Sequence, residues 1–114
     1  MRKVVSESFP DPMILDALAF GQAVRAARTS AGISLEAAAE ALSISKATLG
    51  NLEGGRGTVA LGTALRVARE LGASVFVTPL AASFEAGAAL QALRDAAPQL
   101  WGRPRPSTAM PATR

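Results

Sequence analysis

Residues 32–56 decide the fold of this chain and read GISLEAAAEALSISKATLGNLEGGR. Ser34 and Ser45 each precede a helix-forming run, at the position where a side-chain oxygen caps free backbone N–H groups. The run over 35–42 repeats apolar residues at the three- and four-residue spacing that gives a helix one apolar face. We therefore expect two short helices, 35–42 and 46–53, joined by a tight turn.

The second expected helix has two contrasting sides. Its leucines, Leu49 and Leu52, face inward. Its outward row consists of Lys46, Ala47, Gly50 and Asn51. Ala39 lies where the two helices cross, and its small side chain permits close approach. Two short helices at a steep angle, with a small and polar outer face on the second, make a helix-turn-helix, and a plain helical hairpin is the alternative.

A helix on each side of this motif completes a unit over residues 13–72. The first should begin between residues 13 and 16 and end by Gly32, which suits the left-handed position after a helix. The last should be capped by Thr58, after the glycine loop 54–57, and should end at Leu71. The expected inner faces are Leu18, Gly21, Val24, Ala27, Arg28 and Ala31 in the first, and Leu61, Ala64, Leu65, Ala68 and Leu71 in the last. Four helices in about 60 residues indicate a mostly α domain with short loops.

Residues 73–78, ASVFVT, change the pattern because they are β-branched and aromatic and precede Pro79. The pairing residues of this expected strand are Ser74, Val75, Phe76, Val77 and Thr78. A lone strand leaves backbone groups unpaired, and elsewhere only residues 4–5 suggest a second strand. The same strand of a second copy, antiparallel across a two-fold axis, would pair them. The sequence therefore predicts a homodimer.

The ends of the chain flank this unit. Residues 1–12 are expected to form a flexible arm, and Ser83 should cap an additional helix over 84–97. The apolar side of that helix consists of Phe84, Ala88, Leu90 and Leu93. Residues 99–114 are rich in proline and small residues and are expected to be disordered, except that Trp101 needs a packing partner. The predicted divisions are the arm 1–12, the helix-turn-helix domain 13–72, the dimerisation strand and C-terminal helix 73–98, and the tail 99–114.

Composition narrows the range of functions. The chain has no cysteine, histidine or tyrosine, which removes thiolate and imidazole ligands and the commonest general base. The glycine loop lacks the lysine of a nucleotide-binding loop, so we expect no enzyme and no metal or cofactor site. No apolar run approaches the roughly 20 residues that span a bilayer, and no signal peptide is evident, so we expect a cytoplasmic, nucleoid-associated protein without a membrane partner. The net charge of +3 favours a polyanionic partner.

Residues 20–72 resemble the XRE, or Cro/C1-type, helix-turn-helix family. The shared features are GQAVRAARTSAGIS (21–34), Ala39, SISKATLGNLEGG (43–55) and LRVARELG (65–72). Residues 43–53 and 60–79 are similar, more narrowly, to the HipB-type antitoxins. The resemblance implies a compact lambda-repressor-like domain of four to five helices and a dimeric repressor on a palindromic operator in double-stranded DNA. The antitoxin branch further implies autoregulation and a kinase-like toxin as partner.

The resemblance also places the helix 46–53 in the major groove of DNA. The expected base-reading residues are Lys46, Ala47, Gly50 and Asn51, and the expected phosphate contacts are Ser34, Ser45, Thr48 and Arg56. Lys46 would donate to guanine or to a phosphate, and Asn51 would bind adenine. Helix starts attract anions, which supports the serines. Gly50 either lets the backbone approach DNA closely or makes no contact.

Two further points follow from the family pattern. Arg28 and Glu53 match an ion pair of the phage-repressor branch that orients the reading helix. Family members usually carry glutamine after the first capping residue, and its side chain holds a DNA phosphate. This chain has Leu35 at that position and departs from the family pattern. The alternatives are a stand-alone or prophage regulator, or an interaction module without DNA binding, which Leu35 and Gly50 favour. Arg25 is either a phosphate contact or a solvated side chain.

Overall fold

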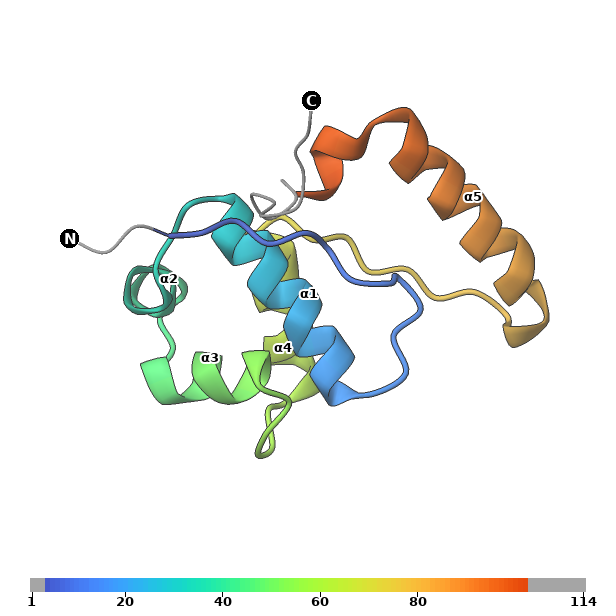
Figure 1. Ribbon diagram of the computed structural model, residues 1–114. Coiled ribbons are helices and arrows are strands. Elements are labelled where there is room, and N and C mark those ends of the chain that lie inside the picture. The colour runs from blue at the N-terminus through green and yellow to red at the C-terminus, as the bar shows by residue number, and fades with distance from the viewer. Residues whose placement is uncertain (1–3, 103–114) are drawn as a thin grey trace, which may run out of the picture.

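The computed structural model describes residues 4–102, which fold into helices joined by short loops (Figure 1). The elements are α1 (Ala17–Ser30), α2 (Leu35–Leu42), α3 (Lys46–Glu53), α4 (Leu61–Glu70), the 3₁₀ segment η1 (Leu80–Ala82), α5 (Ser83–Ala96) and the 3₁₀ segment η2 (Pro98–Trp101). No strand occurs within residues 4–102, so this part of the chain is all α. The prediction of a mostly α fold is confirmed.

The helix starts of the motif follow local hydrogen-bond chemistry. Ser34 Oγ accepts from the backbone N–H of Ala37 at 3.1 Å, and Ser45 Oγ accepts from that of Thr48 at 2.9 Å. The predicted helix-turn-helix, with its two serine caps, is therefore confirmed. Ser43, between the helices, has φ 59° and ψ 41°, a left-handed conformation that is unfavourable for a residue with a side chain.

The core lies between α1, α2, α3 and α4 (Figure 1). It consists of Val24, Ala38, Ala39, Leu42, Leu49, Leu52, Ala64, Val67 and Ala68. Most of these residues are small, so the helices approach closely. The closest approach is at Gly21, where a Cβ atom would lie 2.2 Å from the carbonyl oxygen of Leu52. Backbone contact of this kind fixes α3 against α1.

Several predicted features at the flanks are wrong. Thr58 does not cap α4, which begins later and has Ala60 at its N-cap without a side-chain hydrogen bond. Leu61 and Leu65, predicted on the inner face of α4, are 72% and 40% exposed, and Leu61 borders an open hollow of about 320 Å³. Leu18 and Ala31 are also exposed, since they lie at the two ends of α1, beyond the central contact with α3. Val67, which the sequence pattern left out, is fully buried instead.

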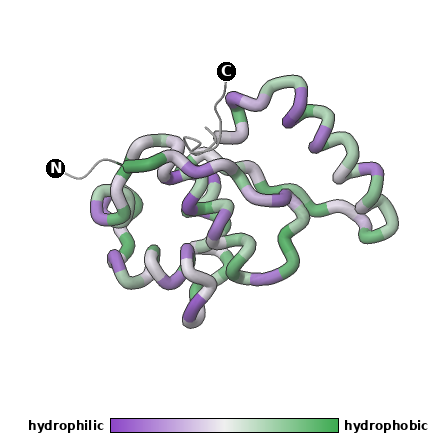
Figure 2. The backbone as a smooth tube through the Cα atoms, viewed as in Figure 1, coloured by the Kyte–Doolittle hydropathy of each residue, from purple (hydrophilic) through white to green (hydrophobic). Residues whose placement is uncertain are grey.

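The C-terminal part has no core of its own. Residues 73–79 run without regular structure from α4 to η1, and Figure 2 shows hydrophobic residues along this segment. The helix α5 has no fully buried residue, and Phe84 on its predicted apolar side is 84% exposed. Ser83 is not the N-cap of α5, because η1 leads directly into the helix and Ala82 takes that position.

The N-terminal arm lies along α1 and reaches the end of the described chain (Figure 1). The Phe9 N–H donates to the Trp101 carbonyl at 2.8 Å, and their rings make an edge-to-face contact with centroids 6.3 Å apart. The Arg94 guanidinium donates to the Phe9 carbonyl at 2.6 Å and lies 5.1 Å from the Trp101 ring centroid. The expected packing partner of Trp101 is thus present. Residues 103–114 of the predicted tail lie outside the described residues.

Candidate nucleic-acid interface

The helix α3 has a buried side and an accessible side. Leu49 is fully buried and Leu52 is 7% exposed, which anchors the helix on α1 and α2. The four predicted base-reading residues lie on the accessible side. Lys46 and Ala47 are exposed, and Gly50 and Asn51 are partly exposed. The structure therefore places the four side-chain positions together on one surface.

The side chain of Lys46 is engaged by an acid from the neighbouring helix. Lys46 Nζ lies 2.8 Å from Glu36 Oε2, in the first turn of α2. Both side chains remain largely solvent-exposed, at 59% and 66%. The sequence does not reveal this partner, because the two residues belong to different helices and meet only when the helices cross.

The hydroxyl groups near the start of α3 serve the helix itself. Ser45 Oγ accepts from the Thr48 N–H and lies 2.8 Å from Thr48 Oγ1. Ser34 Oγ is likewise occupied by its capping bond to α2. These residues hold the two positive helix ends in place next to the accessible side of α3.

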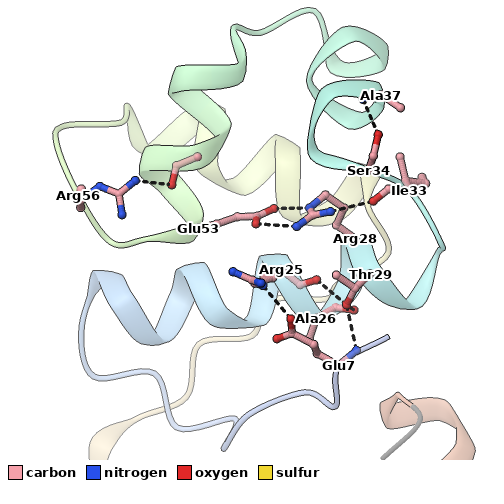
Figure 3. A network of polar contacts seen from close by, with 11 residues as sticks. Glu7, Arg25, Ala26, Arg28, Thr29, Ile33, Ser34, Ala37, Glu53 and Arg56 are labelled. Atoms are coloured by element: carbon pink, nitrogen blue, oxygen red, sulfur yellow. Dashed lines mark hydrogen bonds and ion pairs between the residues drawn. The ribbon is translucent and has the colours of Figure 1, made fainter. Parts of the chain in front are cut away.

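Arg56 is folded back against the carboxyl end of α3. Its guanidinium donates to the Gly50 carbonyl at 3.4 Å, as Figure 3 shows, and its backbone N–H donates to the Asn51 carbonyl at 2.8 Å. The side chain of Asn51 lies beside the glycine loop, where a Cβ atom on Gly57 would be 3.4 Å from its Nδ2. A phosphate contact by Arg56 would require its side chain to leave the helix end.

A buried ion pair fixes the far end of α3 (Figure 3). Arg28 Nε donates to Glu53 Oε2 at 2.6 Å and Arg28 Nη2 donates to Glu53 Oε1 at 3.0 Å. Arg28 Nη1 also donates to the carbonyl of Ile33, before α2, at 2.8 Å. The side chains are only 8% and 6% exposed. One guanidinium therefore joins α1, the approach to α2 and the end of α3, and such two-pronged bonds restrict orientation strongly.

Arg25, one turn before Arg28 in α1, has a different environment. Its Nε lies 2.8 Å from Glu7 Oε2, and the side chains are 53% and 33% exposed. The backbone N–H of Glu7 also donates to Thr29 Oγ1 at 3.0 Å, so the arm is tied to α1 at two points (Figure 3). The sequence does not reveal this pairing, because Glu7 and Arg25 lie 18 residues apart in the chain.

These observations define a rigid pair of helices with one accessible, small and polar face. The model of a known family, described as helix-turn-helix domain, matches residues 19–78, more than half of the chain, which includes most of α1 and all of α2, α3 and α4. The chain belongs to the helix-turn-helix domain family. This confirms the broad family resemblance and supports a DNA-binding regulator, while the HipB-type branch stays a prediction.

Among solved structures, this helix-turn-helix protein is similar to the clp gene regulator ClgR from Corynebacterium glutamicum. The sequence identity is 34%, the match covers 80% of this chain and 89% of that chain, and the TM-score is 0.48. No curated protein matches the sequence. No helix within residues 4–102 is long and apolar enough to cross a membrane.

Proposed function

We propose that this chain is a sequence-specific repressor that binds a palindromic operator as a homodimer. The observation that carries the proposal is the accessible face of α3, where Lys46, Ala47, Gly50 and Asn51 lie together while the opposite side is buried. A helix held in this way fits the major groove with its small residues against base edges. Within that groove, Lys46 would donate to guanine and Asn51 would bind adenine.

The environment of Gly50 supports close approach by DNA. Glycine inside a helix costs about 1 kcal/mol relative to alanine, so its presence calls for a reason. Packing does not supply one, because the nearest atom to a Cβ at this position would be Leu35 Cδ2, at 3.9 Å. The fold would thus accept alanine, and the backbone at Gly50 is open to close approach by DNA.

The homodimer is supported by the segment that follows α4. Among the described residues, 74–78 make no backbone–backbone hydrogen bond. Phe76 is 79% exposed and Val77 is 95% exposed, an unfavourable state for apolar side chains. The same segment of a second copy would pair the backbone groups and cover these side chains. A two-fold axis would then set two α3 helices roughly 34 Å apart, one turn of DNA.

The groove assignment is tested with the double variant Lys46→Ala, Asn51→Ala. It should lose preference for a fluorescent duplex of its own promoter over a scrambled duplex, with circular dichroism unchanged. The matched control is Arg25→Ala with Gln22→Ala, which removes the same charge and one amide from the exposed side of α1. The control should keep the preference. Retained preference in the α3 variant would count against the proposal.

The dimer is tested by replacing Phe76 and Val77 with proline. Proline cannot donate to a strand ladder, so the variant should elute as a monomer and bind the promoter far more weakly. Light scattering after gel filtration measures the mass directly. An unchanged dimer would show that another surface joins the copies.

The narrower role is an autoregulating, HipB-like antitoxin with a kinase-like toxin as partner. Its support is the resemblance of residues 43–53 and 60–79 to that branch. A neighbouring gene for such a toxin, or co-purification of a larger acidic protein, would support it. If neither the gene nor the protein partner is found, a stand-alone or prophage regulator is the better interpretation.

A non-catalytic interaction module is the second candidate. It is favoured by Leu35 in place of the usual phosphate-binding glutamine and by the engagement of Lys46 with Glu36. Titration of the promoter duplex at two salt concentrations separates the candidates. A repressor should bind in the presence of competitor DNA and weaken steeply with salt, whereas a module without DNA binding should do neither.

A further inference from the structure

We propose that Glu36 withholds Lys46 from DNA and thereby lowers the affinity of the motif for DNA, both with and without the operator sequence. The inference rests on the proposed DNA-binding function. Its basis is the 2.8 Å contact between Glu36 Oε2 and Lys46 Nζ at the accessible start of α3. The contact places a carboxylate beside the first residue of the expected reading helix.

The charges around the motif give this contact its importance. Residues 34–56 carry three acidic and two basic residues, so the motif itself is not a basic patch. Lys46 is the only basic residue of α3. The other basic residue, Arg56, donates to the Gly50 carbonyl at 3.4 Å and is turned toward the helix end. The attraction of α3 for phosphate groups therefore depends on Lys46, and Glu36 neutralises it.

Lys46 leaves Glu36 when its contact with DNA is at least as strong as the ion pair. An exposed ion pair of this kind, with side chains 59% and 66% exposed, favours association by about fivefold at most. A lysine–phosphate contact on random DNA is another exposed ion pair of similar strength, so little is gained by the exchange. A two-pronged lysine–guanine contact discriminates by roughly fivefold to a hundredfold. Any duplex must therefore compete with Glu36 for Lys46, so the ion pair lowers affinity for random DNA and for the operator alike.

The variant Glu36→Gln tests this directly. Affinity is measured for the promoter duplex and for a scrambled duplex of equal length and composition, at two salt concentrations. Affinity for the scrambled duplex should rise by up to about fivefold per subunit, and its salt dependence should steepen by roughly one phosphate contact per subunit. Affinity for the promoter should rise by at least as much, because Lys46 no longer has to leave Glu36 to reach a guanine.

Glu70→Gln is the matched control. It makes the same charge change in another exposed ion pair, where Arg66 Nη1 lies 3.4 Å from Glu70 Oε2 on α4, away from the start of α3. The control should leave both affinities within about twofold of the parent protein, whereas an equal gain in both variants would reduce the effect to net charge and overturn the inference.

A second background isolates the role of Lys46. In a Lys46→Gln protein, Glu36→Gln should give no gain on the scrambled duplex, because no lysine is left to release. A gain of the same size there would overturn the inference, as would a Glu36→Gln variant that binds the scrambled duplex like the parent. A parent protein without preference for its promoter would instead contradict the proposed function, and the scrambled-duplex comparison would still decide the role of Glu36.

Discussion

The substitution Glu53→Gln should destabilise this protein more than its small chemical change suggests. The two side chains of the pair are 8% and 6% exposed, so the charge of Arg28 would stay buried without a counterion. Removal of one partner of a buried ion pair costs about 3–5 kcal/mol. That is a large share of the about 5–15 kcal/mol by which native domains are stable. We expect a much lower urea midpoint and partial unfolding at 25 °C.

The double variant Arg28→Met, Glu53→Leu removes both charges of the buried ion pair. Replacement of both partners by apolar residues of similar volume is often neutral or stabilising. Here Arg28 Nη1 also donates to the Ile33 carbonyl, and loss of that bond leaves the carbonyl without its partner, at about 1–3 kcal/mol. The double variant should therefore be more stable than Glu53→Gln alone, yet less stable than the parent protein.

Urea denaturation followed by far-ultraviolet circular dichroism measures these differences, provided that all variants show the same slope. Glu7→Gln is the control, because its pair with Arg25 is 33% and 53% exposed and should contribute less than about 1 kcal/mol. Two results would refute the reasoning. One is a Glu53→Gln variant no less stable than Glu7→Gln, and the other is a double variant less stable than Glu53→Gln.

Three further predictions concern other sites. Gly50→Ala should raise the free energy of unfolding by about 1 kcal/mol, because its Cβ would meet only Leu35 Cδ2 at 3.9 Å. The same variant should bind the promoter duplex more weakly, and unaltered binding would argue against close approach of DNA. Gly21→Ala should lower the free energy of unfolding by about 1–3 kcal/mol or more, since its Cβ would lie 2.2 Å from the Leu52 carbonyl oxygen. The control Gly62→Ala should raise the free energy of unfolding, because nothing lies within 4 Å of that Cβ. Equal urea midpoints for the two variants would contradict the packing argument. Arg94→Ala should shift the fluorescence of Trp101, the only tryptophan, to longer wavelength, since its guanidinium lies 5.1 Å from the ring centroid; an unshifted spectrum would mean that the contact is not maintained in solution.

The local features of the helix-turn-helix were accessible from the sequence. The caps Ser34 and Ser45 act on N–H groups three residues away, so the bounds of α2 and α3 follow from short-range hydrogen bonding. The division of α3 into a buried leucine side and an accessible side follows from helical periodicity. The need of residues 73–78 for a partner also follows from backbone chemistry, although the partner itself remains a proposal.

The tertiary structure decided which side chains meet across elements. The contact of Gly21 with α3, the pairing of Lys46 with Glu36 and the exposure of Leu61 all depend on how whole helices cross. Composition and periodicity describe one segment at a time, and they placed the exposed Leu61 on the inner face of α4 while they left out the buried Val67. What the sequence determined by itself is therefore the set of α-helices and the two sides of α3, because hydrogen bonds and periodicity act within a few residues. The charge environment of α3 was decided only by tertiary packing, because it joins residues that no local rule connects.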